Sequence, residues 1–345
     1  MGQNLPVKGD GRESMTSTDS LSSVEIPGAV IERLKQIMEE KCRKIEERLS
    51  CKLLVLMMAE RWASIERRTV DDVLKFLTEH GDQYADAKRL NVMLHSSGGD
   101  ADAAYQIAKL LNTFTKKHKM RLNFLIPRMA KSAATLLACS GDRILMTQIA
   151  ELGPIDPQIM TPTGRWVSAR TVRDSINELL EIIEQRTRLS AQRLSLLFGE
   201  LPLMEIGQFN RLIRYVKNLL AELLRMRMFR GRKGEQRLKN VCARLTEGYE
   251  YHGKPIMFDE AKKIGLKVNL LEGEDEKVVL DAYWSFLSHA ELLESYAAAL
   301  LQALPTPIYI PTRVQIEHGI LYLPLTAETL LGEEVPRPLS RRRHH

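Results

Sequence analysis

The chain has 345 residues, of which 44% are hydrophobic and 27% are charged. This composition excludes a largely disordered protein and provides enough apolar residues for one substantial α/β core. The 50 basic and 44 acidic residues are interspersed, so the net charge of +6 gives no reason to expect nucleic-acid binding.

The sequence shows no sign of secretion, of a membrane span or of a metal site. Residues 1–25 are polar and lack the apolar segment of a signal peptide, and no run of about 18 apolar residues occurs. The four cysteines form no CxxC pair and have no histidine at metal-ligand spacing. We therefore expect a cytoplasmic protein without a cofactor or a metal, whose residues 1–25 form a flexible leader.

The elements expected from residue 26 onwards alternate between helix and strand. Apolar residues at helical spacing predict a helix over 27–49, and the segment 52–58, apolar after its first residue, predicts a buried strand. Further strands are predicted at 91–94, 122–126 and 142–146, and further helices at 103–117 and 132–139. Repeated β-β-α or β-α units of this length imply a mainly parallel sheet with helices packed on it.

The pattern beyond residue 157 is mostly helical. Amphipathic helices are predicted at 171–188, 206–228 and 259–264, a strand at 266–268, and β-like structure at 306–323. Gly265 suits the C′ position that ends a helix. The basic stretch 225–239 is interpreted as a solvated helix end or a subunit contact.

These patterns divide the chain into four parts. A flexible leader, 1–25, precedes an α/β domain, 26–270, which contains a helical insertion at about 170–245. An accessory region, 271–335, and a basic tail, 336–345, follow.

Two turns combine features from which a catalytic site can be built. Gly98 and Gly99 lie between a strand and a helix that Asp100 can cap, so backbone N–H groups can approach a ligand closely. Ser132 begins a helix of small residues after the next strand. Taken singly, a Gly-Gly turn is usually only a turn, and a serine at this place is usually an N-cap. Together they could supply a nucleophile and an oxyanion hole.

Four segments carry a resemblance to a known family. They are Leu94-His-Ser-Ser-Gly-Gly-Asp100, Ala130-Lys-Ser-Ala-Ala-Thr-Leu-Leu137, Ala150-Glu-Leu-Gly-Pro-Ile-Asp-Pro-Gln158 and the stretch from Tyr251 to Leu266. In this order they resemble the signature segments of the serine dehydrogenase proteinases, a family in the clan of the Clp protease catalytic subunit and signal peptide peptidase A. The resemblance covers roughly Leu53 to Val268. It implies a Clp-protease/crotonase-like α/β fold of repeated β-β-α units, here with accessory C-terminal helices.

The resemblance also implies roles for residues of the two turns. Ser132 matches the nucleophile, Ala133 N–H matches the donor that follows it, and Gly98 matches the donor of the glycine turn, with Gly99 beside it. The reaction would be peptide-bond hydrolysis through an acyl-enzyme, on a protein or peptide substrate. The clan also implies a homo-oligomer, and a partner protein is a further possibility.

The residues that serve as general base in the clan are missing at the corresponding places of this sequence. The segment where the Clp subunit has its histidine is Leu152-Gly-Pro-Ile-Asp156, and residues 161–189 contain no lysine. Arginine stays protonated and is a poor base. Three residues remain as candidates for the base: His252, His95 and Lys131.

Each of these candidates has a simpler interpretation. His252 could be an exposed loop residue, and His95 could orient a neighbour or pack instead of contacting substrate. Lys131 adjoins Ser132 in sequence, but adjacent side chains on a turn generally diverge. Asp156 could orient a histidine in a triad or fix a turn between two prolines, and Glu151 is equally open.

Three functions are therefore compared. The first is a serine peptidase with Ser132 as nucleophile. The second is a catalytically silent scaffold or partner-binding subunit, which the missing His and Lys favour. The third is acyl-CoA chemistry of the crotonase type, which also uses an oxyanion hole, but the Ala-Lys-Ser-Ala segment fits peptidases better. We expect the first.

Overall fold

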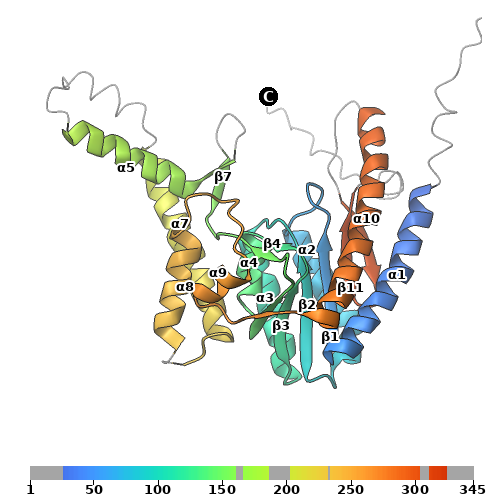
Figure 1. Ribbon diagram of the computed structural model, residues 1–345. Coiled ribbons are helices and arrows are strands. Elements are labelled where there is room, and N and C mark those ends of the chain that lie inside the picture. Colours follow the sequence, from blue (N-terminus) through green and yellow to red (C-terminus); the bar gives the residue numbers. More distant parts are fainter. Residues whose placement is uncertain (1–25, 161–165, 186–202, 232–233, 304–310, 325–345) are drawn as a thin grey trace, which may run out of the picture.

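The centre of the protein is a seven-stranded sheet with the strand order β10-β11-β1-β2-β3-β5-β9 (Figure 1). The structure, a computed structural model, describes residues 26–160, 166–185, 203–231, 234–303 and 311–324. All neighbours in the sheet pair in parallel except β10 with β11. The strands are β1 Lys52–Met58, β2 Arg89–His95, β3 Arg121–Ile126, β5 Arg143–Met146, β9 Val268–Leu270, β10 Thr312–Ile316 and β11 Gly319–Leu323.

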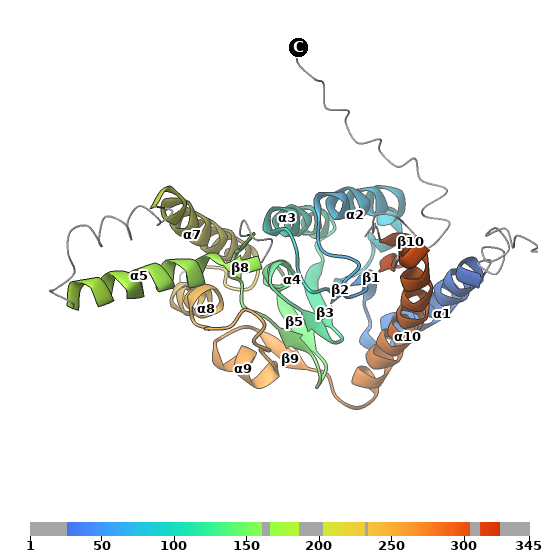
Figure 2. The same ribbon diagram turned by 90° about the horizontal axis from the view of Figure 1, so that it is seen from above.

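Helices cover both faces of this sheet, as the view from above shows (Figure 2). One face carries α2 Arg67–His80, α3 Ala101–Lys117, α4 Ala133–Ala138, α7 Leu203–Met226 and α8 Glu235–Glu247. The opposite face carries α1 Ile26–Leu49 and α10 Gly273–Ala303, which pack against one another.

Two small two-stranded sheets lie outside the main sheet. The parallel pair is β4 Met129–Ala130 with β6 Glu151–Leu152, and the antiparallel pair is β7 Gln158–Met160 with β8 Trp166–Ser168. The remaining described elements are the 3₁₀ turn Gly81–Tyr84, α5 Ala169–Gln185 and α9 Phe258–Lys263.

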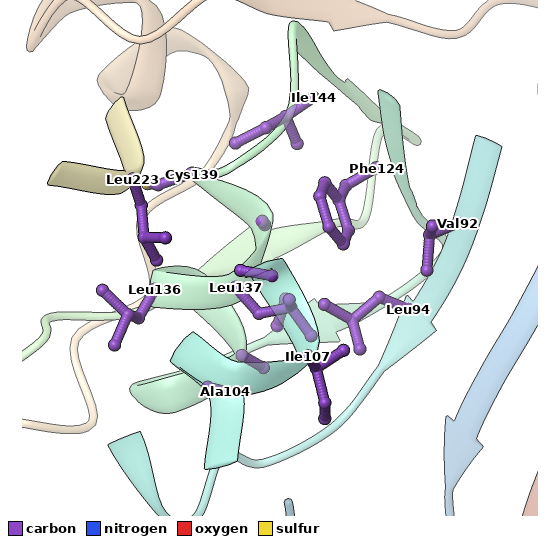
Figure 3. Close-up of a cluster of buried hydrophobic side chains, with 14 of the residues drawn as sticks. Val92, Leu94, Ala104, Ile107, Phe124, Leu136, Leu137, Cys139, Ile144 and Leu223 are labelled. Atoms are coloured by element: carbon purple, nitrogen blue, oxygen red, sulfur yellow. The ribbon is translucent and has the colours of Figure 1, made fainter. Parts of the chain in front are cut away.

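The continuous apolar run of β1 is explained by the two helical layers. Leu54, Leu56 and Met58 pack in the core beneath α2 and α3, whereas the alternate residues Leu53 and Val55 pack in the core beneath α1 and α10. A strand whose successive side chains point to opposite faces must be apolar throughout when both faces are buried. Figure 3 shows the larger core, in which side chains of β2 and β3 meet those of α3 and α4.

The fold class expected from the sequence is confirmed: the protein has a mixed α/β architecture with a mainly parallel central sheet. The predicted helix over 27–49 and the strands over 52–58, 91–94 and 122–126 agree with the described elements to within a few residues. The expected flexible leader, 1–25, and basic tail, 336–345, lie outside the described residues.

The proposed boundary at residue 270 does not coincide with a structural boundary. Strand β11 pairs with β1 inside the main sheet, and the second core is built largely from α10. The region 271–335, expected to be accessory, is therefore part of the fold wherever it is described. Its longest element, the 31-residue α10, is not among the predicted helices.

No helix in the described ranges has both the length and the apolar character needed to cross a membrane.

Candidate active site

The glycine turn after β2 is held by the backbone of Ile65. The Ile65 N–H donates to the Gly98 carbonyl over 2.7 Å, and the Ile65 carbonyl accepts from the Asp100 N–H over 2.8 Å. A Cβ atom on Gly99 would lie 2.3 Å from the Ile65 oxygen, and the φ angle of Gly99 is +136°. Only glycine combines this positive φ with so close an approach of two backbones.

Gly98 is packed directly against the segment that carries Ser132. A Cβ atom on Gly98 would lie 2.9 Å from both the Ser132 Cβ and the Lys131 carbonyl oxygen, and 3.4 Å from the Ala133 nitrogen. The φ angle of Gly98 is +118°. The two turns identified in the sequence are therefore in contact, and the absence of a side chain at Gly98 is what permits it.

Ser132 has a strained backbone at the point where the chain enters α4. Its φ of 49° and ψ of −117° lie outside the regions that L residues usually occupy. Such strain costs about 1–3 kcal/mol and concentrates at functional sites. The hydroxyl makes no capping hydrogen bond to the helix, so an ordinary N-cap does not account for the serine.

Asp156 and His252 are brought together by an antiparallel backbone pair. The Leu152 N–H donates to the Ile256 carbonyl and the Ile256 N–H to the Leu152 carbonyl, each over 2.9 Å. The pair is a single bridge, and the two segments that leave it lead to Asp156 on one side and to His252 on the other. His252 Nδ1 contacts Asp156 Oδ1.

The electrostatics of Asp156 favour its ionised form. Burial alone would raise the pKa of Asp156, but hydrogen bonds from His252 and Ser168 outweigh it, so the pKa lies below its ordinary value. The Asp156 side chain is only 10% exposed, whereas that of His252 is 30% exposed. A buried carboxylate at Nδ1 leaves Nε2 as the imidazole nitrogen that can exchange a proton elsewhere.

These residues line a single pocket of about 730 Å³. Ser132, Ala133 and Gly99 contribute to it from the two turns, and Asp156 and His252 from the antiparallel pair. The pocket therefore joins all four sequence segments that carry the family resemblance. In the described part of the chain, no group of three or more His, Cys, Asp or Glu side chains could hold a metal ion.

The N–H groups of the two turns differ in their availability. The Gly98 N–H donates to Ser96 Oγ over 3.1 Å. For the Ala133 and Gly99 N–H groups no acceptor occurs among the described residues, and both residues line the pocket. Ala133 occupies the first position of α4, where a helix leaves its N–H without an intrahelical partner.

His95 does not line this pocket. Its side chain is 1% exposed and lies on the opposite face of the sheet, with its ring 5.1 Å from that of Tyr283 and 6.2 Å from that of Phe286 on α10. Burial lowers the pKa of His95 to about 3, with a further contribution from Arg128. The packing interpretation of His95 describes this position better than contact with substrate.

Lys131 and Glu151 pair with one another beside the site. Lys131 Nζ lies 3.2 Å from Glu151 Oε2, and Arg128 Nη1 lies 3.3 Å from Glu151 Oε1. Burial lowers the pKa of Lys131, and Glu151 opposes that shift. Neither Lys131 nor Glu151 is among the residues that line the pocket.

Sequence reasoning missed the walls of the pocket. Tyr215 and Val216 of α7 and Ile65 before α2 line it, and Tyr215 Oη donates to Asp102 Oδ1 over 2.6 Å. Spacing alone gives no signal for Ile65, because its role is carried by backbone atoms. The predicted helix at 206–228 contains Tyr215, but nothing in its pattern indicates which element it faces.

Comparisons with known proteins identify a family for this chain. Residues 27–312 match the family described as ClpP-like SDH-type serine proteinase, a wider stretch than the motifs cover. The chain is 30% identical over 196 residues to one uncharacterized protein of Methanocaldococcus jannaschii, an alignment covering 57% of this chain and 59% of that protein. It is 28% identical over 247 residues to a second one, covering 69% of this chain and 70% of that protein. The chain thus spans under two thirds of the first relative's length.

A solved structure of a membrane-bound stomatin-specific protease resembles 66% of this chain, and the likeness covers 81% of that protein. The sequence identity is 14% and the TM-score is 0.41, so nothing further is inferred from this likeness. The family match over most of the chain is sufficient by itself: this protein belongs to the ClpP-like SDH-type serine proteinases.

Proposed function

We propose that the protein is a serine peptidase in which Ser132 is the nucleophile, His252 the general base and Asp156 the residue that orients the base. The observation that carries the proposal is the contact between His252 Nδ1 and Asp156 Oδ1 in the pocket that Ser132 also lines. A buried carboxylate, an imidazole and a hydroxyl in one cleft are the three parts that acyl transfer requires.

The proton path follows from the tautomer that Asp156 selects. With Nδ1–H donating to the carboxylate, Nε2 carries the lone pair that accepts the Ser132 proton as Oγ attacks the carbonyl carbon of a peptide. The same proton then passes from His252 to the departing amine, which leaves an acyl-enzyme. Water, deprotonated by His252 in turn, hydrolyses the ester and restores Ser132.

Negative charge on the tetrahedral intermediate needs N–H donors. Ala133 N–H is one donor in this proposal, as the resemblance implies. Gly98 N–H can act as the second donor only after its hydrogen bond to Ser96 Oγ breaks. Gly99 N–H has no acceptor among the described residues and is already available. Each such donor stabilises the transition state by about 3–4 kcal/mol.

Covalent labelling with a fluorophosphonate probe, read by intact mass, tests the nucleophile. We expect one adduct per chain in the unmodified protein and none in Ser132→Ala. Ser288→Ala, on the exposed side of α10, is the matched serine control and should label normally. The absence of any adduct on the folded protein would favour the catalytically silent scaffold.

Variants of the base and of its partner separate the remaining roles. His252→Ala should slow labelling by about a thousandfold or more, and Asp156→Asn by a similar factor, because the triad acts as a unit. His289→Ala, which removes a half-buried histidine of α10, should label at the normal rate. Normal labelling of a folded His252→Ala would remove His252 from the mechanism.

Peptide substrates and a homo-oligomeric state are part of the same proposal. The family consists of proteinases, which supports a protein or peptide substrate. Sedimentation velocity of the full chain tests the oligomer: a single species heavier than one chain is expected, and a monomer that labels fully would show that assembly is not required.

A further inference from the structure

A second pocket, of about 800 Å³, lies at the amino-terminal ends of β2, β3 and β5. The Ser132 pocket lies beyond the carboxyl-terminal ends of the same strands, so the two open at opposite edges of the sheet. We call the second one the basic pocket. Its cationic lining residues are Arg48, Arg89, Arg121, Arg143, Arg227 and Lys267, and its acidic ones are Asp142 and Asp275.

Sheet register places three of these arginines side by side. Arg89 of β2 pairs in register with Arg121 of β3, and Arg143 of β5 pairs with Asn123, two residues further along β3. All three side chains leave the same face of the sheet, because each alternates with residues buried in the core on the opposite face. Like charges on directly paired residues destabilise a sheet, and an anion between Arg89 and Arg121 would offset their repulsion.

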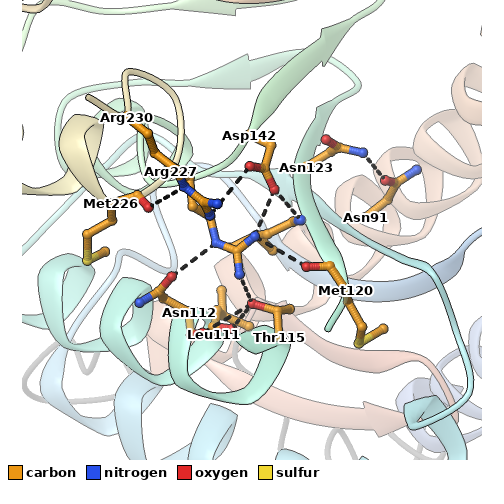
Figure 4. A network of polar contacts seen from close by, with 11 residues as sticks. Asn91, Leu111, Asn112, Thr115, Met120, Asn123, Asp142, Met226, Arg227 and Arg230 are labelled. Carbon is orange, nitrogen blue, oxygen red and sulfur yellow. Dashed lines mark hydrogen bonds and ion pairs between the residues drawn. The ribbon is translucent and has the colours of Figure 1, made fainter. Parts of the chain in front are cut away.

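The two carboxylates of the pocket pair with two of its own cations, Arg227 and Arg48. Asp142 Oδ2 accepts from Arg227 Nη1 over 2.7 Å, and Figure 4 shows that carboxylate directed at Arg227. Asp275 accepts from Arg48 Nε over 2.5 Å. Arg89 and Arg121 are exposed and have no carboxylate partner in the described ranges of the chain, and Lys267 Nζ lies over the Phe229 ring, 5.8 Å from its centroid.

The floor of the pocket is polar where the same strands are otherwise apolar. Asn91 and Asn123 are 2% and 7% exposed, and Asn123 Nδ2 donates to Asn91 Oδ1 over 2.9 Å (Figure 4). Helices α1 and α10 cover the sheet over β1 and β2, where Met93 is buried. They do not cover β5 and β9, where Arg143 and Asn269 are exposed. A merely solvated sheet face needs neither a buried amide pair nor two arginines without a carboxylate partner on directly paired positions.

The geometry points to the basic pocket as a binding site for a small molecule that carries two or more adjacent phosphate groups. Arginine forks bind phosphate oxygens bidentately, and Arg89 and Arg121, on directly paired positions, line a volume typical of small-ligand sites. Amides on the floor can add neutral hydrogen bonds. The inference concerns binding alone and does not depend on Ser132 or on peptidase activity.

Calorimetric titration of the full chain with inorganic pyrophosphate tests this site at physiological ionic strength. We expect saturable binding and a rise in the melting temperature of the protein. The Arg89→Gln/Arg121→Gln variant should bind at least about a hundredfold more weakly, because the removal of each arginine weakens binding by about tenfold. Arg33→Gln, an exposed arginine of α1 outside the pocket, is the matched control and should bind as the unmodified protein does.

Three results would overturn the inference. They are no pyrophosphate binding by the unmodified protein, equal binding by the double variant, and citrate binding as tight as that of pyrophosphate. Lys267→Gln provides a second, independent variant should the double variant unfold, and it too should weaken binding by about tenfold. Higher salt should weaken the interaction, because a partly exposed site is screened.

Discussion

The contact between the glycine turn and Ser132 can be tested by adding a single methyl group. In Gly98→Ala the new Cβ would lie 2.9 Å from the Ser132 Cβ and from the Lys131 carbonyl oxygen, where ordinary contacts begin near 3.4 Å. The φ of +118° adds backbone strain of about 1–3 kcal/mol. Relief of the overlap requires Ser132 to move by several tenths of an ångström.

Two measurements separate strain from displacement. Unfolding in denaturant should show a loss of about 1–3 kcal/mol from strain, with an added loss from the overlap. The rate of fluorophosphonate labelling should fall about tenfold, since a misplacement of about 1 Å lowers the rate of a reacting group about a hundredfold and the shift expected here is roughly half of that.

Gly231→Ala is the matched control. Gly231 has a φ of +77°, but a Cβ there would meet nothing within 4 Å. Its substitution should reduce stability by about 1–2 kcal/mol through strain and leave labelling unchanged. A folded Gly98→Ala that labels at the normal rate would refute the argument that this glycine positions the nucleophile.

Three further predictions concern stability. Arg227→Met should reduce the free energy of unfolding by about 3–5 kcal/mol, because the 2%-exposed guanidinium bonds Asp142, Asn112 and Thr115. The side chain of Arg230 is 59% exposed and lies 3.9 Å from the same carboxylate, so Arg230→Met should change that free energy by less than about 1 kcal/mol. Equal losses for the two variants in urea denaturation would contradict this. Phe124→Ala, in the core of Figure 3, should cost about 3–5 kcal/mol by the same measurement, and Leu74→Ala, 49% exposed, at most about 0.5 kcal/mol. Between pH 6.5 and about 3 the unfolded chain protonates His95 and the folded chain does not, so this residue lowers stability as the pH falls, by up to about 1.4 kcal/mol per pH unit. His95→Leu should flatten that part of the pH profile, and an unchanged slope would show that His95 is not held neutral.

Much of the central sheet can be predicted from the sequence because both of its faces are buried. The run 53–58 has to be apolar throughout, and that pattern is recognisable without knowledge of its neighbours. The pairing of β11 with β1 cannot be predicted in this way. Nothing local in either segment specifies a partner that lies about 260 residues away.

The missed helix α10 does have a sequence signal. Val279, Tyr283, Phe286, Ala290 and Leu293 follow helical spacing and form one side of the second core. The helix lies beyond the segments that carry the family resemblance, so only this periodicity could have revealed it.

The candidate site is predictable in part. Two turns with special backbone requirements can be found from their residue types, Gly98 with Gly99 and Ser132 with Ala133. Asp156 and His252 meet on two segments that are joined by a single backbone pair, Leu152 with Ile256, 104 residues apart. Backbone pairing of that range leaves no trace in a single sequence.

The position of β11 has a consequence for the order in which the protein can fold during synthesis. Strand β1 leaves the ribosome early, but the strand beside it, β11, follows about 260 residues later. At cellular rates of about 5–20 residues per second, that interval is roughly 15–50 s. Throughout it, an apolar strand lacks a neighbour on one edge and can pair with another nascent chain. Chaperone binding to the growing chain should therefore concentrate on the segment 52–58 and end once residue 323 has emerged.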